Sequence, residues 1–141
     1  MAVTRLDTFT STGKKTVYYS DFTDNFDKEL FGDDLLAVTN EKSVNQSLKN
    51  LIYTNVNERP FQPLVGSSIR KMLFEPNTPS DLNALKNFIF TTITNFEPRV
   101  NLVDVTVTSE VDSETITATI TYTLINTQAP ITLTLFLNRV R

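Results

Sequence analysis

The spacing of apolar residues along the chain changes near residue 100. Before this point, apolar side chains recur every three or four residues, as they do on one face of a helix. After it, apolar and polar residues alternate, which turns every second side chain to the same face of a strand. Short connectors between the alternating segments favour antiparallel pairing. The pattern therefore predicts an α+β domain with about three helices packed on a C-terminal three-stranded antiparallel meander.

Two helices are predicted in the first half of the domain. The first begins at Thr39 or Asn40, either of which can cap it, and ends near Asn55. Gly66 makes the turn before a second, short helix that is capped by one of the two serines following it. The residues that recur on one face of the first helix are Val44, Leu48, Leu51, Ile52 and Asn55, and the second helix carries Ile69, Met72, Leu73 and Phe74.

The third helix has the clearest start signal in the sequence. Thr78 is predicted to cap it, Pro79 to take the first helical position and Asp81 to complete a capping box. Since the residue before a proline avoids the α region, the helix should end at or just before Glu97. Its apolar stripe is predicted to contain Leu82, Leu85, Phe88, Ile89, Ile93 and Phe96.

Three strands are predicted after the third helix, and the N-terminal region is predicted to differ from the rest. Residues 1–35 are interpreted as an arm or extension, with weak extended segments at 17–22 and 33–38, and residues 36–141 as the domain. The apolar faces of the three strands are predicted to be Val103, Val105 and Val107, then Ile116, Ala118, Ile120, Tyr122 and Leu124, then Ile131, Leu133, Leu135 and Leu137.

A charged junction is predicted where the third helix meets the sheet. Glu97 falls at the negative end of the helix dipole, where a carboxylate is unfavourable unless a cation offsets it. Arg99, Arg59 and Arg70 are the candidates for that cation, and Glu97 and Arg99 are interpreted as a buried or half-buried pair. Glu58 and Arg59 are either a second charge pair held in a proline-stiffened connector or an ordinary solvated loop.

The last predicted strand carries no charge between Ile131 and Leu137. Natural sheets protect exposed edges with charged residues, proline or bulges. An uncharged strand at a sheet edge therefore suggests an edge that accepts a strand from another protein. It is equally consistent with a strand that is central, or covered by the N-terminal segment.

Composition narrows the chemistry that the chain can perform. The chain of 141 residues contains no cysteine and no histidine, which excludes disulfides, Cys/His zinc sites and nucleophilic schemes with a histidine base. The net charge of −3 and the absence of long apolar runs predict a soluble intracellular product with no cofactor and no nucleic-acid or membrane partner. A local basic patch remains possible from Arg59, Arg70, Lys71, Arg99, Arg139 and Arg141.

Carboxylates and hydroxyls are what remain for catalysis. Glu75 and Glu97 each follow a phenylalanine and precede a proline, at two predicted helix ends. A pair of carboxylates flanking a glycosidic bond is what a glycoside hydrolase of the muramidase type needs. Pairing of each glutamate with an arginine or with backbone is the more ordinary explanation, because an adjacent arginine lowers the pKa that a general acid needs to keep high.

Several short segments, taken in this order, resemble one known family. The resemblance covers roughly residues 30 to 141 and is to the baseplate wedge protein of contractile-tailed phages, which the type VI secretion baseplate shares and which is often labelled lysozyme-like. The segments are Asn40 to Asn50, Glu58-Arg59-Pro60-Phe61, Pro63, Gly66-Ser67, Leu73-Phe74-Glu75-Pro76 and Glu97-Pro98-Arg99-Val100.

The resemblance implies a structural, non-enzymatic subunit of the virion tail baseplate, assembled in the host cytoplasm. Family members sit in the wedge beside the tail tube and nucleate the contractile sheath, whose extended arms their C-terminal sheet accepts. A free-standing regulatory binding module is a further alternative. The expected wedge-core contacts are Glu97, Pro98, Arg99, Glu58 and Arg59, and the expected sheath-strand site is Ile131, Leu133, Leu135 and Leu137.

Overall fold

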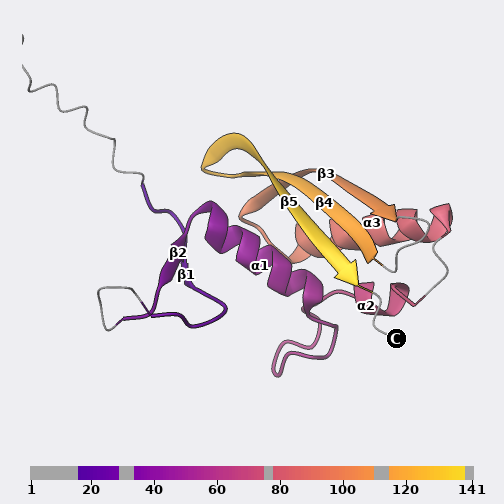
Figure 1. Cartoon of the computed structure of the whole chain (residues 1–141), viewed down its shortest axis with the longest axis horizontal. Coiled ribbons are helices and arrows are strands. Elements are labelled where there is room, and N and C mark those ends of the chain that lie inside the picture. Colours follow the sequence, from indigo (N-terminus) through magenta and orange to yellow (C-terminus); the bar gives the residue numbers. More distant parts are fainter. Residues whose placement is uncertain (1–15, 29–33, 75–77, 110–114, 139–141) are drawn as a thin grey trace, which may run out of the picture.

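A computed structural model describes residues 16–28, 34–74, 78–109 and 115–138 of the chain. The predicted helices and the C-terminal antiparallel sheet, with strand order β3-β4-β5, are confirmed. A separate two-stranded antiparallel sheet, β1-β2, precedes them (Figure 1). The elements are β1 (Ser20–Phe22), β2 (Ala37–Thr39), α1 (Glu41–Tyr53), α2 (Ile69–Met72), α3 (Pro79–Phe96), β3 (Val100–Ser109), β4 (Thr115–Leu124) and β5 (Thr127–Asn138).

Helix α3 begins as its sequence predicts. Thr78 Oγ1 accepts a hydrogen bond from the Asp81 backbone N–H at 3.3 Å, and the Thr78 N–H donates to Asp81 Oδ2 at 3.3 Å. This reciprocal capping box satisfies two backbone donors that the helix itself leaves unpaired. Pro79 takes the first helical position, and the helix ends at Phe96, so that Glu97 is its C-cap.

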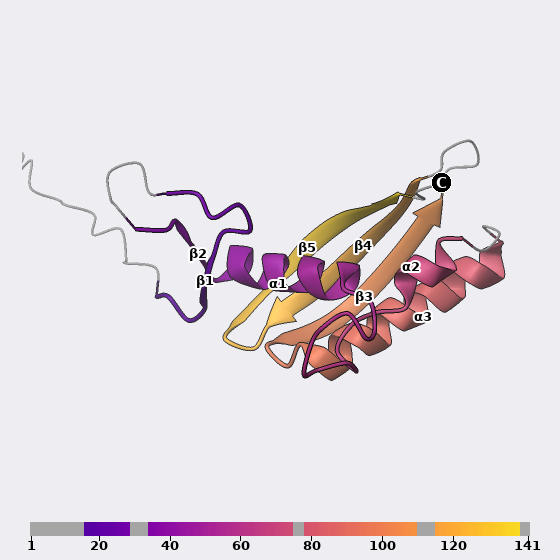
Figure 2. The same ribbon diagram turned by 90° about the horizontal axis from the view of Figure 1, so that it is seen from below.

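One hydrophobic core contains side chains from the helices and from all three strands of the C-terminal sheet. Helix α3 runs along β3, and α1 crosses the sheet on the side of β5 (Figure 2). Leu85, Ile89 and Ile93 of the predicted α3 stripe are buried. Phe88 was predicted to join them but is 45% exposed, because it lies roughly a quarter turn from the centre of the buried face.

Strand β3 departs from simple alternation at a β-bulge. Leu102 pairs with Tyr122 and Asp104 with Thr121, so the residue between them has no partner in β4. That residue, Val103, was predicted to point into the core but is 60% exposed. An extra residue in one strand of a ladder reverses which positions face inward. The strand is therefore buried at Val100 before the bulge and at residue 105 after it.

The segment before α1 is fastened to the domain through Asn40. This residue was predicted to cap α1, but its side chain makes no capping bond. Instead, Asn40 Oδ1 accepts from the Tyr18 N–H at 2.9 Å and its Nδ2 donates to the Thr16 carbonyl at 2.9 Å. The backbone at Asn40 has a φ of +51°, which asparagine adopts more readily than most residues. The extended segments expected at 17–22 and 33–38 correspond to the shorter strands β1 and β2, which pair with each other. Strand β2 ends one residue later than expected.

Residues 1–15, and with them most of the predicted arm, lie outside the described residues. Within the described ranges, no helix is both long and apolar enough to cross a membrane.

Candidate functional site

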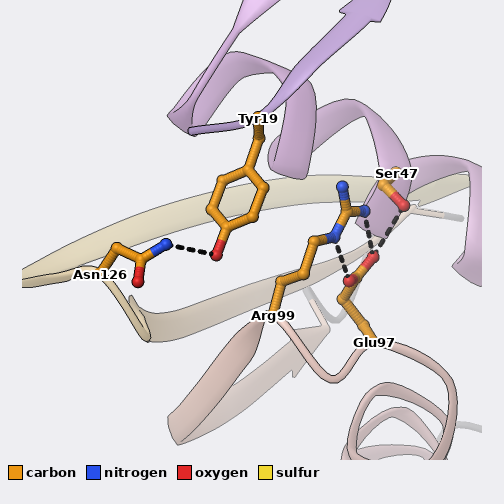
Figure 3. Close-up of polar contacts among 5 residues, drawn as sticks. All are labelled: Tyr19, Ser47, Glu97, Arg99 and Asn126. Atoms are coloured by element: carbon orange, nitrogen blue, oxygen red, sulfur yellow. Dashed lines mark hydrogen bonds and ion pairs between the residues drawn. The ribbon is translucent and has the colours of Figure 1, made fainter. Parts of the chain in front are cut away.

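Glu97 and Arg99 form a tight ion pair where α3 ends and β3 begins (Figure 3). Arg99 Nε donates to Glu97 Oε1 at 2.6 Å, and Arg99 Nη2 donates to Glu97 Oε2 at 2.8 Å. Ser47 of α1 adds a third hydrogen bond, from Oγ to Oε2 at 2.7 Å. The carboxylate side chain is 5% exposed and the guanidinium side chain 34%. The predicted half-buried charged junction is confirmed, with Arg99 as the cation among the three candidates.

The local backbone explains why these two side chains meet. Pro98 cannot continue the helix, so the chain turns after Glu97, whose N–H still donates to the Ile93 carbonyl at 2.9 Å. The turn brings the side chain at position 99 back over the carboxylate two residues earlier. Arg99 thus places positive charge at the negative end of the α3 dipole, where Glu97 alone would be unfavourable.

The electrostatics of the junction keep Glu97 ionised. Burial alone would raise the pKa of its carboxyl group, because a low-dielectric environment disfavours the charged form. The hydrogen bonds from Arg99 and Ser47 outweigh this effect and hold the pKa of Glu97 below its ordinary value of 4.5. The same pairing raises the pKa of Arg99, so both groups are charged at neutral pH.

This lowered pKa predicts a specific loss of stability in acid. The ionised carboxylate contributes fully above the ordinary pKa of 4.5, and the contribution disappears as the pH falls through the lower pKa of the folded state. The urea midpoints of the wild type and of Glu97→Gln should therefore differ at pH 7 and converge below pH 4.5. A midpoint difference that stays constant from pH 7 to strongly acidic conditions would contradict an ionised, paired Glu97.

Tyr19 and Asn126 connect the N-terminal segment and the β4–β5 turn to the junction. The Arg99 guanidinium lies over the Tyr19 ring, 5.5 Å from its centroid, which is within the range of a cation–π contact. The Tyr19 hydroxyl accepts a hydrogen bond from Asn126 Nδ2 at 3.0 Å, in the turn between β4 and β5 (Figure 3). Sequence reasoning missed Ser47, Tyr19 and Asn126, because they lie far from residues 97–99 in sequence and no local motif marks them.

The connector residues Glu58 and Arg59 do not take part in this junction. Both are exposed, and Glu58 Oε2 accepts a hydrogen bond from the Asn55 backbone N–H at 2.7 Å. The described residues show no ion pair between Glu58 and Arg59. Of the two interpretations of this connector, the structure favours the solvated loop.

Strand β5 lies at one edge of its sheet and turns Ile131, Leu133, Leu135 and Leu137 toward the core, whereas Phe136 is 62% exposed. Leu135 and Leu137 are buried, while Ile131 and Leu133 are partly buried against the core. These four side chains are therefore not available to a partner. What β5 offers along its outer edge is backbone.

The direction of the β5 backbone groups follows from one hydrogen bond. Tyr53 of α1 donates from its hydroxyl to the Phe136 carbonyl at 3.0 Å, so this carbonyl faces away from β4. Successive residues of an antiparallel strand turn their N–H and C=O groups to opposite edges. The backbone N–H and C=O groups of Thr132 and Thr134 therefore also point away from β4. Pro130 faces the same outer edge, where its lack of an N–H leaves the ladder with β4 intact. The described N-terminal strands pair with each other and not with β5.

Comparison with known proteins assigns the chain to a family. A sequence model of the family described as baseplate wedge protein gp25 matches residues 38–129. The chain belongs to this family. It is 31% identical to baseplate wedge protein gp25 of Enterobacteria phage T4 over 85 residues, which are 60% of this chain and 64% of the relative. It is 30% identical to baseplate protein W of Escherichia phage P2 over 102 residues, which are 72% of this chain and 88% of the relative.

Solved structures share the gp25-family fold. A Geobacter sulfurreducens protein named as a candidate tail lysozyme aligns with a TM-score of 0.66 at 22% identity, over 72% of this chain and 92% of its own. A chain of the type VI secretion baseplate complex aligns with a TM-score of 0.61 at 17% identity, over 71% of this chain and 93% of its own. The resemblance seen in the sequence is thus confirmed at the level of the family.

The glycoside hydrolase alternative depends on two glutamates, of which the structure describes only Glu97. Glu75 lies outside the described residues. Glu97 has both carboxylate oxygens engaged by Arg99 and Ser47, and its lowered pKa is the opposite of what a general acid needs. Within the part of the chain that the structure describes, the contacts of Glu97 are therefore those of a structural ion pair and do not favour a catalytic role. The described residues also hold no group of three or more Asp or Glu side chains arranged to bind a metal ion.

Proposed function

We propose that this chain is a structural wedge subunit that binds the wedge core and starts sheath assembly by accepting a sheath strand at β5. Family membership supports the wedge role. By the same analogy its partners are other baseplate wedge proteins and the tail sheath protein, with the tail tube nearby. It acts without enzymatic activity, in a virion tail baseplate that assembles in the host cytoplasm.

The outer edge of β5 is the proposed site at which the sheath strand binds. Thr132 and Thr134 present unpaired ladder positions to the outside, and the strand from Ile131 to Leu137 carries no charge that would repel another strand. Since the side chains of Ile131, Leu133, Leu135 and Leu137 point into the core, recognition proceeds through the backbone. The Tyr53 hydroxyl already occupies the Phe136 carbonyl, which limits the open edge to the residues before it.

The charged junction and the connector residues are the proposed site of contact with the wedge core. Pro98 is exposed and Arg99 is partly exposed, so both can reach a neighbouring chain, as can the exposed Glu58 and Arg59. The Nε and Nη2 groups of Arg99 already donate hydrogen bonds to Glu97. Its contribution to a partner therefore comes from Nη1 and from the exposed face of the guanidinium, and not from a bidentate fork.

Hydrogen–deuterium exchange tests strand addition residue by residue. In the isolated subunit, the amides of Thr132 and Thr134 should exchange fast, because they face outward. Addition of the purified sheath subunit should protect both of them. The amides of Leu133 and Leu135 are an internal control, since the β4 ladder protects them already. Unchanged exchange at Thr132 and Thr134 in a sheath-bound subunit would exclude strand addition at this edge.

A further inference from the structure

The loop between α1 and α2, residues 54–66, holds two apolar side chains out in solvent. Phe61 is 102% exposed and Leu64 is 77% exposed, which are the two highest exposed fractions among the large apolar side chains of the described residues. Exposed apolar side chains that stand alone are common, but two on one short loop form a patch of the kind that marks an interaction site.

The loop is held in shape by its own backbone. The Asn57 N–H donates to the Pro63 carbonyl at 2.8 Å across the loop, and the Ser67 N–H donates to the Thr54 carbonyl at 2.8 Å at its base. Pro60 and Pro63 fix two further backbone angles. An ordered loop can present Phe61 to a partner without the entropic cost of ordering the loop on binding.

The loop holds Phe61 in a backbone conformation that this residue type disfavours, and its base needs a glycine. Phe61 has a φ of +68°, a left-handed conformation that is uncommon for a bulky residue. At the base, Gly66 has a φ of +146°, and a Cβ there would lie 2.7 Å from the Asn55 carbonyl carbon. Backbone strain of this kind is retained where the surrounding structure imposes it, and it is concentrated at ligand clamps and similar sites.

The foot of the loop adjoins a basic groove. A groove of about 280 Å³ between the loop and α2 is lined by residues that include Val56, Arg70 and Lys71. Residues 54–74 contain three cations, Arg59 and these two, and a single acid, Glu58, in a chain whose net charge is −3. The carboxylate of Glu58 is engaged by the loop backbone. The surface is therefore apolar at its tip and basic at its foot.

We propose that the 54–66 loop is a preformed plug that inserts Phe61 into an apolar pocket of a neighbouring baseplate protein. Carboxylates at the rim of that pocket face Arg59, Arg70 and Lys71. A fully exposed aromatic side chain beside an arginine is the composition typical of interface hot spots. The charge on this face selects an acidic partner over a basic one. The surface is separate from the β5 edge, although the choice of a baseplate partner depends on the proposed wedge role.

Photo-crosslinking from position 61 identifies the occupant. The full chain, with p-benzoylphenylalanine at position 61, is assembled into baseplates, irradiated, and the linked peptide is sequenced. The expected product joins this position to an apolar, Asp/Glu-flanked peptide of another baseplate protein. The same probe at Phe26, which is also exposed at 69%, should not link to that peptide. A product with lipid, with a second copy of this chain, or no product at all would overturn the proposal.

Substitution of Phe61 tests how much this side chain contributes to binding in the baseplate. Phe61→Ser should leave the urea midpoint unchanged, because the side chain contacts little of its own chain, and should lower incorporation into baseplates at least about tenfold. Phe61→Leu should retain part of the incorporation, and Phe26→Ser all of it. Protection of Thr132 and Thr134 by the sheath subunit should persist in Phe61→Ser, so this test is independent of the β5 edge. Normal incorporation of Phe61→Ser would overturn the proposal.

Discussion

Proline in place of Thr134 is expected to abolish sheath assembly on this subunit while the domain still folds and enters baseplates. The Thr134 N–H faces away from β4, so proline removes no bond of the β4–β5 ladder. It does remove a donor that an added strand needs, and its ring obstructs the approach of that strand. The readout is sheath length on isolated baseplates by electron microscopy, with the urea midpoint as the measure of folding.

Two kinds of control separate edge pairing from loss of structure. Thr134→Val keeps the backbone N–H and should support normal sheaths. Leu133→Pro and Leu135→Pro remove a donor that faces β4 and also disturb buried side chains, so they should destabilise the sheet itself. The proline at position 134 should cost about 1 kcal/mol or somewhat more, since its fixed φ does not match a strand. A folded Thr134→Pro subunit that bears normal sheaths would exclude strand addition at β5.

Local sequence signals sufficed wherever neighbouring residues determine the structure. The capping box at Thr78 depends on residues within one turn, and the helix formed where this motif placed it. The strict alternation of β4 likewise predicted its buried face, because β4 is the central strand and pairs without a bulge over most of its length. The ion pair of Glu97 and Arg99 could be anticipated for the same reason, because only Pro98 lies between its partners.

The failures occurred where tertiary contacts overrode local preference. Asn40 is a good helix cap by residue type, yet its amide serves the strand segment at Thr16 and Tyr18. The bulge at Val103 changes which positions of β3 face inward, and the adjacent apolar residues Leu102 and Val103 do not show by themselves which of the two is left unpaired. Ser47, which donates the third side-chain hydrogen bond to the Glu97 carboxylate, lies fifty residues away from it on a different helix. No periodicity or motif carries this kind of information.

Removal of the Arg99 side chain is expected to destabilise the domain by about 2–3 kcal/mol. Arg99→Ala removes both guanidinium hydrogen bonds from the buried Glu97 carboxylate and leaves it the Ser47 hydroxyl and the backbone of residue 99. Breaking a fully buried ion pair from one side costs about 3–5 kcal/mol, and the partial exposure of Arg99 reduces this figure. The exposed pair Lys86–Asp104 is a matched control, because an ion pair in full contact with solvent contributes little, so Lys86→Ala should leave the urea midpoint almost unchanged. Equal urea midpoints for the two variants would show that the junction does not stabilise the fold.

A double-mutant cycle then separates the structural role of Arg99 from its proposed role in wedge binding. Glu97→Gln combined with Arg99→Met removes both charges, so no uncompensated carboxylate remains. The double variant should be at least about 1 kcal/mol more stable than the sum of the single effects predicts. If wedge assembly is still lost in this stable double variant, Arg99 contacts the partner through the guanidinium. If assembly returns together with stability, the pair acts only by holding the end of α3 against β3, and the contact with the wedge core lies elsewhere.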